Sequence, residues 1–242
     1  MNLTRFPRTS RRSLMLTVPV ALAGLLLAWA IPTASAGANP TAAPAAPAAA
    51  NGHGHDAAPA PRTPAQVAFH DQLRKLWEDH ITWTRLAIVT FADGSNGFPA
   101  TATRLLANQQ DIGDAIKPYY GQAAGDRLAA LLHDHITIAV EVLQAAKAGD
   151  SAALADASTR WYANANDIAD FLAAANPRFW PDAVMRAAMK THLDQTLTEA
   201  SDELHANYPA SIADYEAVHA HILAMADLLS SGIIGQFPKR FR

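Results

Sequence analysis

Apolar residues recur at three- and four-residue steps from about residue 63 to residue 234, as they do along the buried face of an α-helix. One such stripe consists of Leu128, Leu131, His135, Ile138 and Val142. Clusters of Gly, Pro, Asn and Asp interrupt the pattern and predict turns. They lie at residues 94–97, 121–125, 149–151, 176–181 and 207–209. Because short turns make neighbouring helices antiparallel, the pattern predicts an all-α, up-and-down bundle of about six helices built from repeated antiparallel hairpins.

An internal repeat supports the hairpin interpretation. The tetrapeptide DHIT occurs at residues 79–82 and again at residues 134–137, an offset of 55. The segment NQQDIGDAI at residues 108–116 is echoed by NANDIADFL at residues 164–172, an offset of 56. Two matches at nearly the same offset favour a duplicated helical hairpin, and a more diverged third copy would contain His192 and His221.

The repeat places one polar side chain on each expected helix at the same distance from a turn. In an antiparallel hairpin, residues equidistant from the turn lie at the same height, here about 15 residues from it, or roughly 22 Å along the helix. The six residues that meet this condition are His80, Asp111, His135, Asp167, His192 and His221. His133 and His219 precede two of them by two residues, so they point about 200° away and are predicted to lie on the surface.

Imidazole and carboxylate groups from facing helices are the usual metal ligands of helical bundles. The sequence therefore predicts a transition-metal site for Zn, Fe, Mn or Cu at His80, Asp111, His135, Asp167, His192 and His221. Three further side chains on the same faces are expected to hydrogen-bond these ligands, namely Asn108, Asn164 and Glu199.

Two other interpretations of the polar layer stay open. Each His and Asp on adjacent helices can form a hydrogen bond that sets the register of the hairpin and performs no chemistry, as in a scaffold or interaction protein. Alternatively, the bundle binds a small molecule in a cavity lined by aromatic side chains. These aromatic residues are Trp77, Trp83, Trp161, Trp180, Tyr119, Tyr120 and Tyr162. No Gly-x-Ser-x-Gly nucleophile motif or phosphate-binding glycine loop is present, so the sequence assigns no catalytic residue.

The N-terminal region is typical of an exported protein. Residues 1–36 combine an arginine-rich head, an apolar run and an Ala-Ser-Ala cleavage site, and SRRSLM at residues 10–15 resembles a twin-arginine signal. Residues 37–63 are rich in Pro and Ala and predict a disordered tether, residues 64–235 the bundle, and residues 236–242 a short tail. We expect a secreted or cell-envelope protein, with membrane or cell-wall association through the N-terminal segment.

Charge and cysteine content narrow the function further. Four of the 19 basic residues and none of the 22 acidic residues lie in residues 1–36, so the remainder has a net charge of −7 at neutral pH. This balance and the lack of a basic patch argue against nucleic acid as a partner. The absence of cysteine excludes disulfides, thiolate metal sites and cysteine nucleophiles.

Four segments resemble a little-characterised family of exported all-helical proteins of Gram-positive bacteria. They are KLWEDHITWTR (residues 75–85), RLLANQQDIGDAIKPYYG (104–121), WYANANDIADFL (161–172) and GIIGQFP (232–238). The resemblance covers about Phe69 to Phe237. It implies export and a helical fold, and it implies no particular activity.

Overall fold

Six α-helices follow one another in the computed structural model, which describes residues 63–242. They are α1 (Pro64–Ala92), α2 (Phe98–Tyr120), α3 (Gln122–Ala148), α4 (Ser151–Ala175), α5 (Asp182–Leu204) and α6 (Tyr208–Gln236), and a 3₁₀-helix, η1 (Pro238–Phe241), follows. Residues 63–242 contain no strand. The predicted all-α bundle of six helices is confirmed, whereas the duplication of a hairpin stays a prediction.

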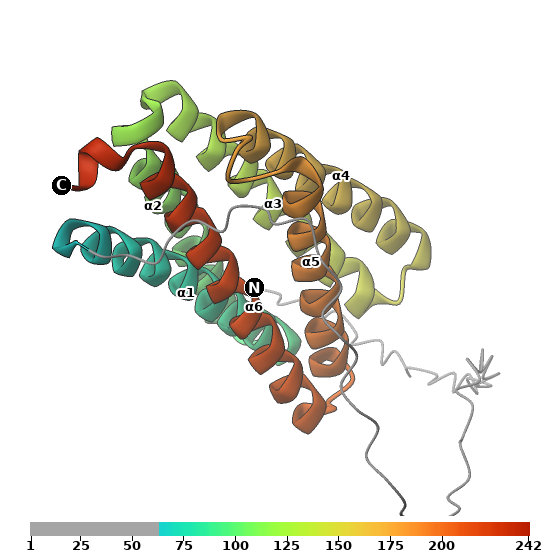
Figure 1. The fold of residues 1–242 in the computed structure, drawn as a ribbon. Coiled ribbons are helices and arrows are strands. Elements are labelled where there is room, and N and C mark those ends of the chain that lie inside the picture. The colour runs from blue at the N-terminus through green and yellow to red at the C-terminus, as the bar shows by residue number, and fades with distance from the viewer. Residues whose placement is uncertain (1–62) are drawn as a thin grey trace, which may run out of the picture. The chain divides into compact units, whose positions relative to one another are not determined.

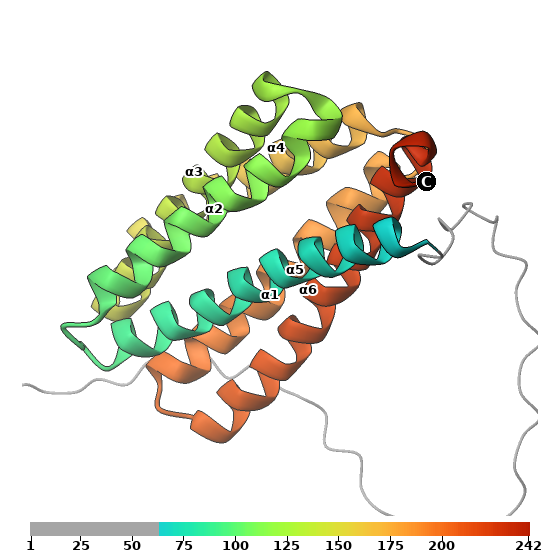
Figure 2. The ribbon, with the colours of Figure 1, turned by 90° about the vertical axis from the view of Figure 1, so that its left-hand side faces the viewer.

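The helices form a closed arrangement in which each one packs on the next and α6 returns to α1. Figure 1 shows the six helices, and the view in Figure 2 shows that α2, α3 and α4 lie on one side of the bundle and α1, α5 and α6 on the other. Alternate helices also meet inside this arrangement, since α1 contacts α3, α1 contacts α5, and α3 contacts α5. Side chains that point inward from these three helices therefore converge in the middle of the bundle.

Local capping explains where several helices begin and end. Thr63 accepts a hydrogen bond from the backbone N–H of Gln66, and the Gln66 side chain accepts one from the Thr63 N–H, which is a capping box. The helix α3 ends at Ala148 and is capped by Gly149, whose φ of +67° is readily adopted only by glycine. Asp150 then accepts a hydrogen bond from the Ala153 N–H and starts α4.

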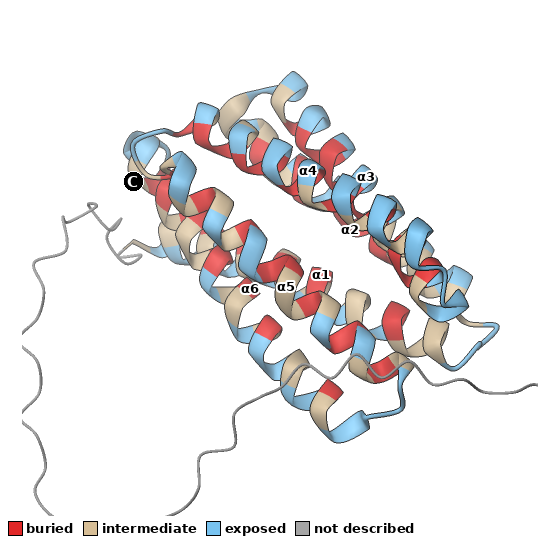
Figure 3. Cartoon of the chain, turned by 90° about the vertical axis from the view of Figure 1, so that its right-hand side faces the viewer, coloured by how far each residue is buried: buried red, intermediate tan, exposed pale blue. Residues whose placement is uncertain are grey.

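The buried faces of the helices form one main core (Figure 3). Most of the core is aliphatic, with Trp77, Trp161 and Trp180 as its largest members. The core also contains buried polar side chains from all six helices, with the largest group on α5, and the candidate site is built from this set.

The last residues pack on the bundle instead of forming a free tail. Phe241 of η1 is buried, and its ring lies 5.1 Å from that of Phe69 and 5.3 Å from that of Tyr119, centroid to centroid. The Thr63 hydroxyl donates a hydrogen bond to the Phe241 carbonyl at 2.8 Å. The C-terminal segment thus joins the first helix to the end of the second.

Gly232 on α6 is a position where no side chain fits. A Cβ atom at Gly232 would lie 2.0 Å from Nε1 of the buried Trp180. We expect Gly232→Ala to lower the free energy of unfolding by about 1–3 kcal/mol, because Trp180 must move within a packed core. Urea denaturation measures this loss, and Ala224→Gly on the exposed face of α6 is a control for the change in helix propensity alone. Equal stability of Gly232→Ala and the parent would contradict this packing.

Two helices, α3 and α6, are long and apolar enough to cross a membrane when judged by length and composition alone. The core helices of soluble proteins meet the same test, and half of each apolar window is buried inside the bundle. The predicted signal segment, and the predicted tether apart from Thr63, lie outside the described residues.

Candidate functional site

Three histidines from three different helices meet in the centre of the bundle. His80 comes from α1, His135 from α3 and His192 from α5, and each is at most 4 % exposed. The ring centroids of His80 and His192 are 5.8 Å apart, and those of His135 and His192 are 6.2 Å apart. We call His80, His135 and His192 the histidine cluster.

The tautomer of His135 follows from its neighbour Asn164 on α4. The Asn164 side-chain N–H donates to the Leu131 carbonyl at 3.1 Å, so its oxygen faces His135. Nδ1–H of His135 donates to that oxygen at 2.8 Å. Neutral His135 therefore has its lone pair on Nε2, which is the form that binds a metal ion.

Gln109 on α2 restrains the His80 ring less firmly than Asn164 restrains the His135 ring. The Gln109 side-chain nitrogen donates to the Leu105 carbonyl at 2.7 Å and lies 3.3 Å from Nδ1 of His80. The Gln109 side-chain oxygen is buried without a hydrogen-bond partner in residues 63–242. The longer contact leaves the His80 ring more freedom than the His135 ring has.

All three imidazoles are neutral at pH 7 because burial disfavours their charged form. Desolvation lowers the pKa of His80 from 6.5 to about 3, with a further contribution from His135. Desolvation also lowers the pKa of His135 to about 4. The pKa of His192 lies well below its usual value, first because of burial and then because of the nearby His80, His135 and His221.

The cluster contains ring nitrogens without hydrogen bonds. Within residues 63–242, Nδ1 of His192 is buried and has no partner, and no hydrogen bond reaches Nε2 of His80 or His135. A buried polar atom without a partner costs about 1–3 kcal/mol. As they stand, no three His, Asp or Glu side chains in this part of the chain are placed to hold a metal ion together.

A small cavity of about 50 Å³ borders all three histidines. Its other walls are almost entirely carbon atoms, supplied by aliphatic side chains and by Trp161, whose ring stacks on that of His135. No Asp, Glu, Lys or Arg lines it. The cavity leaves space in which the imidazole rings can rotate.

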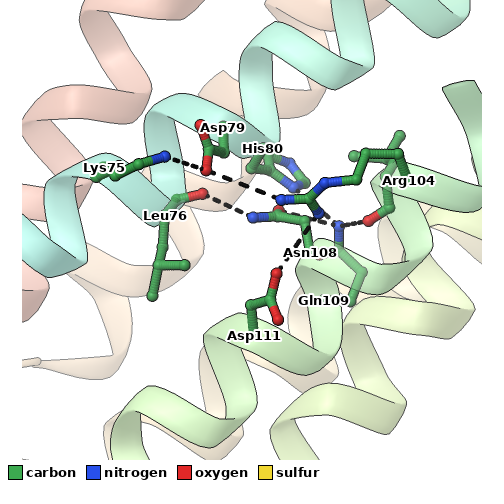
Figure 4. Close-up of polar contacts among 9 residues, drawn as sticks. Lys75, Leu76, Asp79, His80, Arg104, Asn108, Gln109 and Asp111 are labelled. Atoms are coloured by element: carbon green, nitrogen blue, oxygen red, sulfur yellow. Dashed lines mark hydrogen bonds and ion pairs between the residues drawn. The ribbon is translucent and has the colours of Figure 1, made fainter.

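The two predicted aspartates do not belong to this site, and the expectation that they point inward is wrong. Asp111 has 49 % of its side chain exposed and lies 3.5 Å from Arg104 (Figure 4). Asp167 is exposed on α4. The predicted supporting residues Asn108 and Asn164 occupy the buried layer instead.

Asn108 and Asn164 make equivalent contacts in the two hairpins. Asn108 donates to the Leu76 carbonyl at 3.0 Å (Figure 4), and Asn164 donates to the Leu131 carbonyl. Each of these carbonyls lies four residues before a histidine of the cluster. The asparagines thus tie α2 to α1 and α4 to α3 at the height of the cluster.

The remaining predicted ligand, His221, lies at the edge of the cluster. It is half-buried on α6, and its Nε2–H donates to the Ala188 carbonyl at 2.9 Å. His133 is exposed and His219 is half-buried, with Nε2 of His219 3.3 Å from a Glu78 oxygen. The structure therefore brings together three of the six predicted ligands and places a fourth nearby.

Glu199 belongs to a different buried group, which the sequence did not indicate. Arg85 on α1 contacts Glu199 at 3.1 Å and Glu203 at 3.0 Å, and it also donates to the hydroxyl of Ser211 on α6. Ser211 in turn donates to Glu203 at 2.6 Å. We call Arg85, Glu199, Glu203 and Ser211 the Arg85 network.

The Arg85 network is under electrostatic strain. Burial raises the pKa of Glu199 to about 7, although Arg85 opposes this rise. One Glu199 oxygen has no hydrogen-bond partner in residues 63–242. Burial, followed by a hydrogen bond with Asp202, also raises the pKa of the neighbouring Asp214.

The aromatic residues do not form one ligand cavity. Trp161 borders the histidine cavity, whereas Trp77 and Trp180 line a separate space of about 20 Å³. Tyr119 lines a surface hollow together with Asp111. The residues of the expected aromatic cavity are therefore divided among several places.

Comparisons of this chain with protein-family models, with curated proteins and with solved structures find no match.

Proposed function

We propose that the bundle binds one transition-metal ion through the imidazoles of His80, His135 and His192. The observation that carries this proposal is the convergence of three buried, neutral imidazoles from three helices, with ring centroids 5.8 and 6.2 Å apart. Neutral imidazole is the form that coordinates metal ions, and no proton has to be removed from these side chains at pH 7.

Unpaired ring nitrogens support a bound ion. A histidine cluster that served only as a hydrogen-bond network would be expected to pair its nitrogens, yet His192 has a buried nitrogen without a partner in residues 63–242. A metal ion at Nε2 of His135 and at one nitrogen of His192 would satisfy these atoms. Neutral His80 has its proton on Nε2 while Nδ1 accepts from Gln109, so its Nε2 can join them once the proton moves to Nδ1 and Gln109 turns its unpartnered oxygen toward that nitrogen. Binding requires rotation of the rings toward a common point, and the adjoining cavity provides the space.

The ligand set narrows the choice of ion. With Asp111 and Asp167 at the surface, the site is built from imidazoles without a carboxylate. Imidazole ligands suit Zn, Cu and Fe, whereas Mn prefers carboxylate and water ligands. Zn²⁺ is therefore the first ion to test, followed by Cu²⁺ and Fe²⁺. Three protein ligands would leave one coordination position for another molecule.

Export stays part of this proposal. It rests on residues 1–36, which lie outside the described residues, and a twin-arginine route would carry a bundle that had already folded around its ion.

The decisive variant is His192→Leu. We expect Zn²⁺ at 100 times its dissociation constant to raise the free energy of unfolding of the parent by about 2.7 kcal/mol. His192→Leu should abolish this gain, while the metal-free variant should be as stable as the parent, because leucine removes a buried nitrogen that has no partner. Urea denaturation with and without Zn²⁺ measures both effects, and calorimetric titration measures the affinity.

The chain offers a matched control in His133→Leu, which removes a surface histidine two residues from His135. It should leave zinc binding unchanged. Equal stabilisation of the parent and His192→Leu would contradict the proposal. Absence of any zinc effect on the parent would favour the alternative, a scaffold in which Asn108, Asn164 and the histidines set the register of the helices.

A further inference from the structure

The cavity beside the histidine cluster shares a wall with a larger hollow. The hollow has a volume of about 490 Å³, compared with about 50 Å³ for the cavity, and it lies among α3, α4 and α5. Both spaces are bordered by Val142, Leu143, Leu197 and Ala200. Leu197 is half-buried, so one layer of aliphatic side chains separates the hollow from the cavity.

The chemistry of the inner cavity selects uncharged molecules. Apart from the three imidazoles and the indole of Trp161, whose N–H has no partner in residues 63–242, its polar side chains are Thr84 and Thr196. Both hydroxyls donate to a carbonyl of their own helix at 2.8 Å. The cavity therefore offers a ligand no free hydroxyl group and no charged side chain. A charged ligand would lose its hydration without compensation, whereas an apolar molecule would lose little.

The volume of the cavity limits the size of the ligand. An engineered apolar cavity of roughly 150 Å³ in another protein holds benzene and stays free of water. The cavity here has about 50 Å³, so it fits a molecule of a few heavy atoms at most.

We infer that the cavity binds a small, uncharged, apolar molecule of the size class of O₂, which enters from the hollow past Leu143 and Leu197. This molecule lies against the imidazoles of the histidine cluster. Its binding to the cavity does not require a metal ion. Coordination of this molecule to a metal ion at the histidine cluster, as an additional ligand of that ion, rests on the proposed function.

Xenon is a suitable probe because it is uncharged and apolar and forms no chemical bond with the protein. In metal-free protein under increasing xenon pressure, we expect saturable NMR shifts of the Ile136 and Val140 methyl groups, which border only the inner cavity. Ala139→Leu fills this cavity and should abolish the shifts. If Ala139→Leu does not fold, Ala87→Val fills the opposite wall and serves the same purpose.

Ala146→Leu is the matched control, since Ala146 borders only the outer hollow. It should leave the saturable shifts of Ile136 and Val140 in place. Shifts confined to Leu154 and Leu204 of the hollow would overturn the inference, as would the absence of saturable shifts or their persistence in Ala139→Leu. Because these measurements use metal-free protein, xenon binding without zinc binding would contradict the proposed function alone.

Discussion

Arg85→Met is expected to lower the free energy of unfolding by about 3–5 kcal/mol at pH 8. The substitution keeps much of the apolar stem of the side chain and removes the guanidinium that contacts both Glu199 and Glu203. These two carboxylates are 0 % and 3 % exposed, so water cannot replace the lost partner. Urea denaturation of the parent and the variant measures the difference.

The pH dependence of this loss identifies its cause. Without Arg85, the folded state is stabilised when the two buried carboxylates take up protons. The difference in the free energy of unfolding between variant and parent should therefore shrink as the pH falls from 8 to 5. Comparing the two proteins at each pH cancels the titration of all other groups that they share. A loss that does not change with pH would indicate that Arg85 acts through packing alone, for example against the Tyr215 ring 5.8 Å away.

A surface arginine provides the control. Arg104 has 37 % of its side chain exposed and pairs with Asp111 at 3.5 Å and with Asp79 at 4.0 Å. Exposed pairs of this kind contribute about 0–1 kcal/mol. Arg104→Met should therefore change stability by less than 1 kcal/mol, and a loss as large as that of Arg85→Met would contradict the role assigned to burial.

The second large effect is a steep loss of stability in acid for the metal-free protein. Burial lowers the folded-state pKa of His80 to about 3 and of His135 to about 4, and it lowers that of His192 as well. In the unfolded chain these groups titrate near 6.5, so between pH 6.5 and about 4 the unfolded state takes up protons that the folded state does not. The contribution of the three neutral histidines to the free energy of unfolding is therefore complete above pH 6.5 and is lost as the pH falls toward 4.

Glu199 acts in the opposite direction. Its folded-state pKa of about 7 lies above the usual 4.5, so its contribution is largest below pH 4.5 and is lost as the pH rises toward 7. Each group changes stability by at most about 1.4 kcal/mol per pH unit. Three histidines minus one glutamate leave a net loss of roughly 3 kcal/mol per unit of acidification between pH 6 and 4.5.

Urea denaturation of chelator-treated protein at several pH values between 7.5 and 4.5 measures this slope. His192→Leu should reduce it by about 1.4 kcal/mol per pH unit, while His133→Gln on the surface should leave it unchanged. Constant stability of the parent between pH 6.5 and 4.5 would contradict the burial of the histidines.

The misplaced aspartates show what the repeat could and could not reveal. Distance from a turn predicts the height of a residue in a hairpin, but not the direction of its side chain. The core-facing stripe of α2 is Leu105, Gln109, Ile112 and Ile116, with steps of four, three and four residues. Asp111 lies two residues from Gln109, about 200° around the helix. The spacing of this stripe therefore predicts that Gln109 faces the core, where His80 lies, and that Asp111 faces water.

The Arg85 network had no comparable signal in the sequence. Arg85 is separated from Glu199 by 114 residues and from Ser211 by 126. No repeat or spacing pairs these positions, because their contact depends on α1 lying against both α5 and α6. The histidine cavity likewise depends on which helices become neighbours, since its walls come from α1, α2, α3 and α5 and from Trp161 on α4.

By itself the sequence determined the helices, their approximate ends and the height of the histidines, since these follow from the spacing of apolar residues and from local turn chemistry. Only the tertiary structure decided which polar side chains face one another. That choice depends on the rotation of each helix about its axis and on which helices become neighbours, and the burial of apolar stripes sets both for the whole bundle at once.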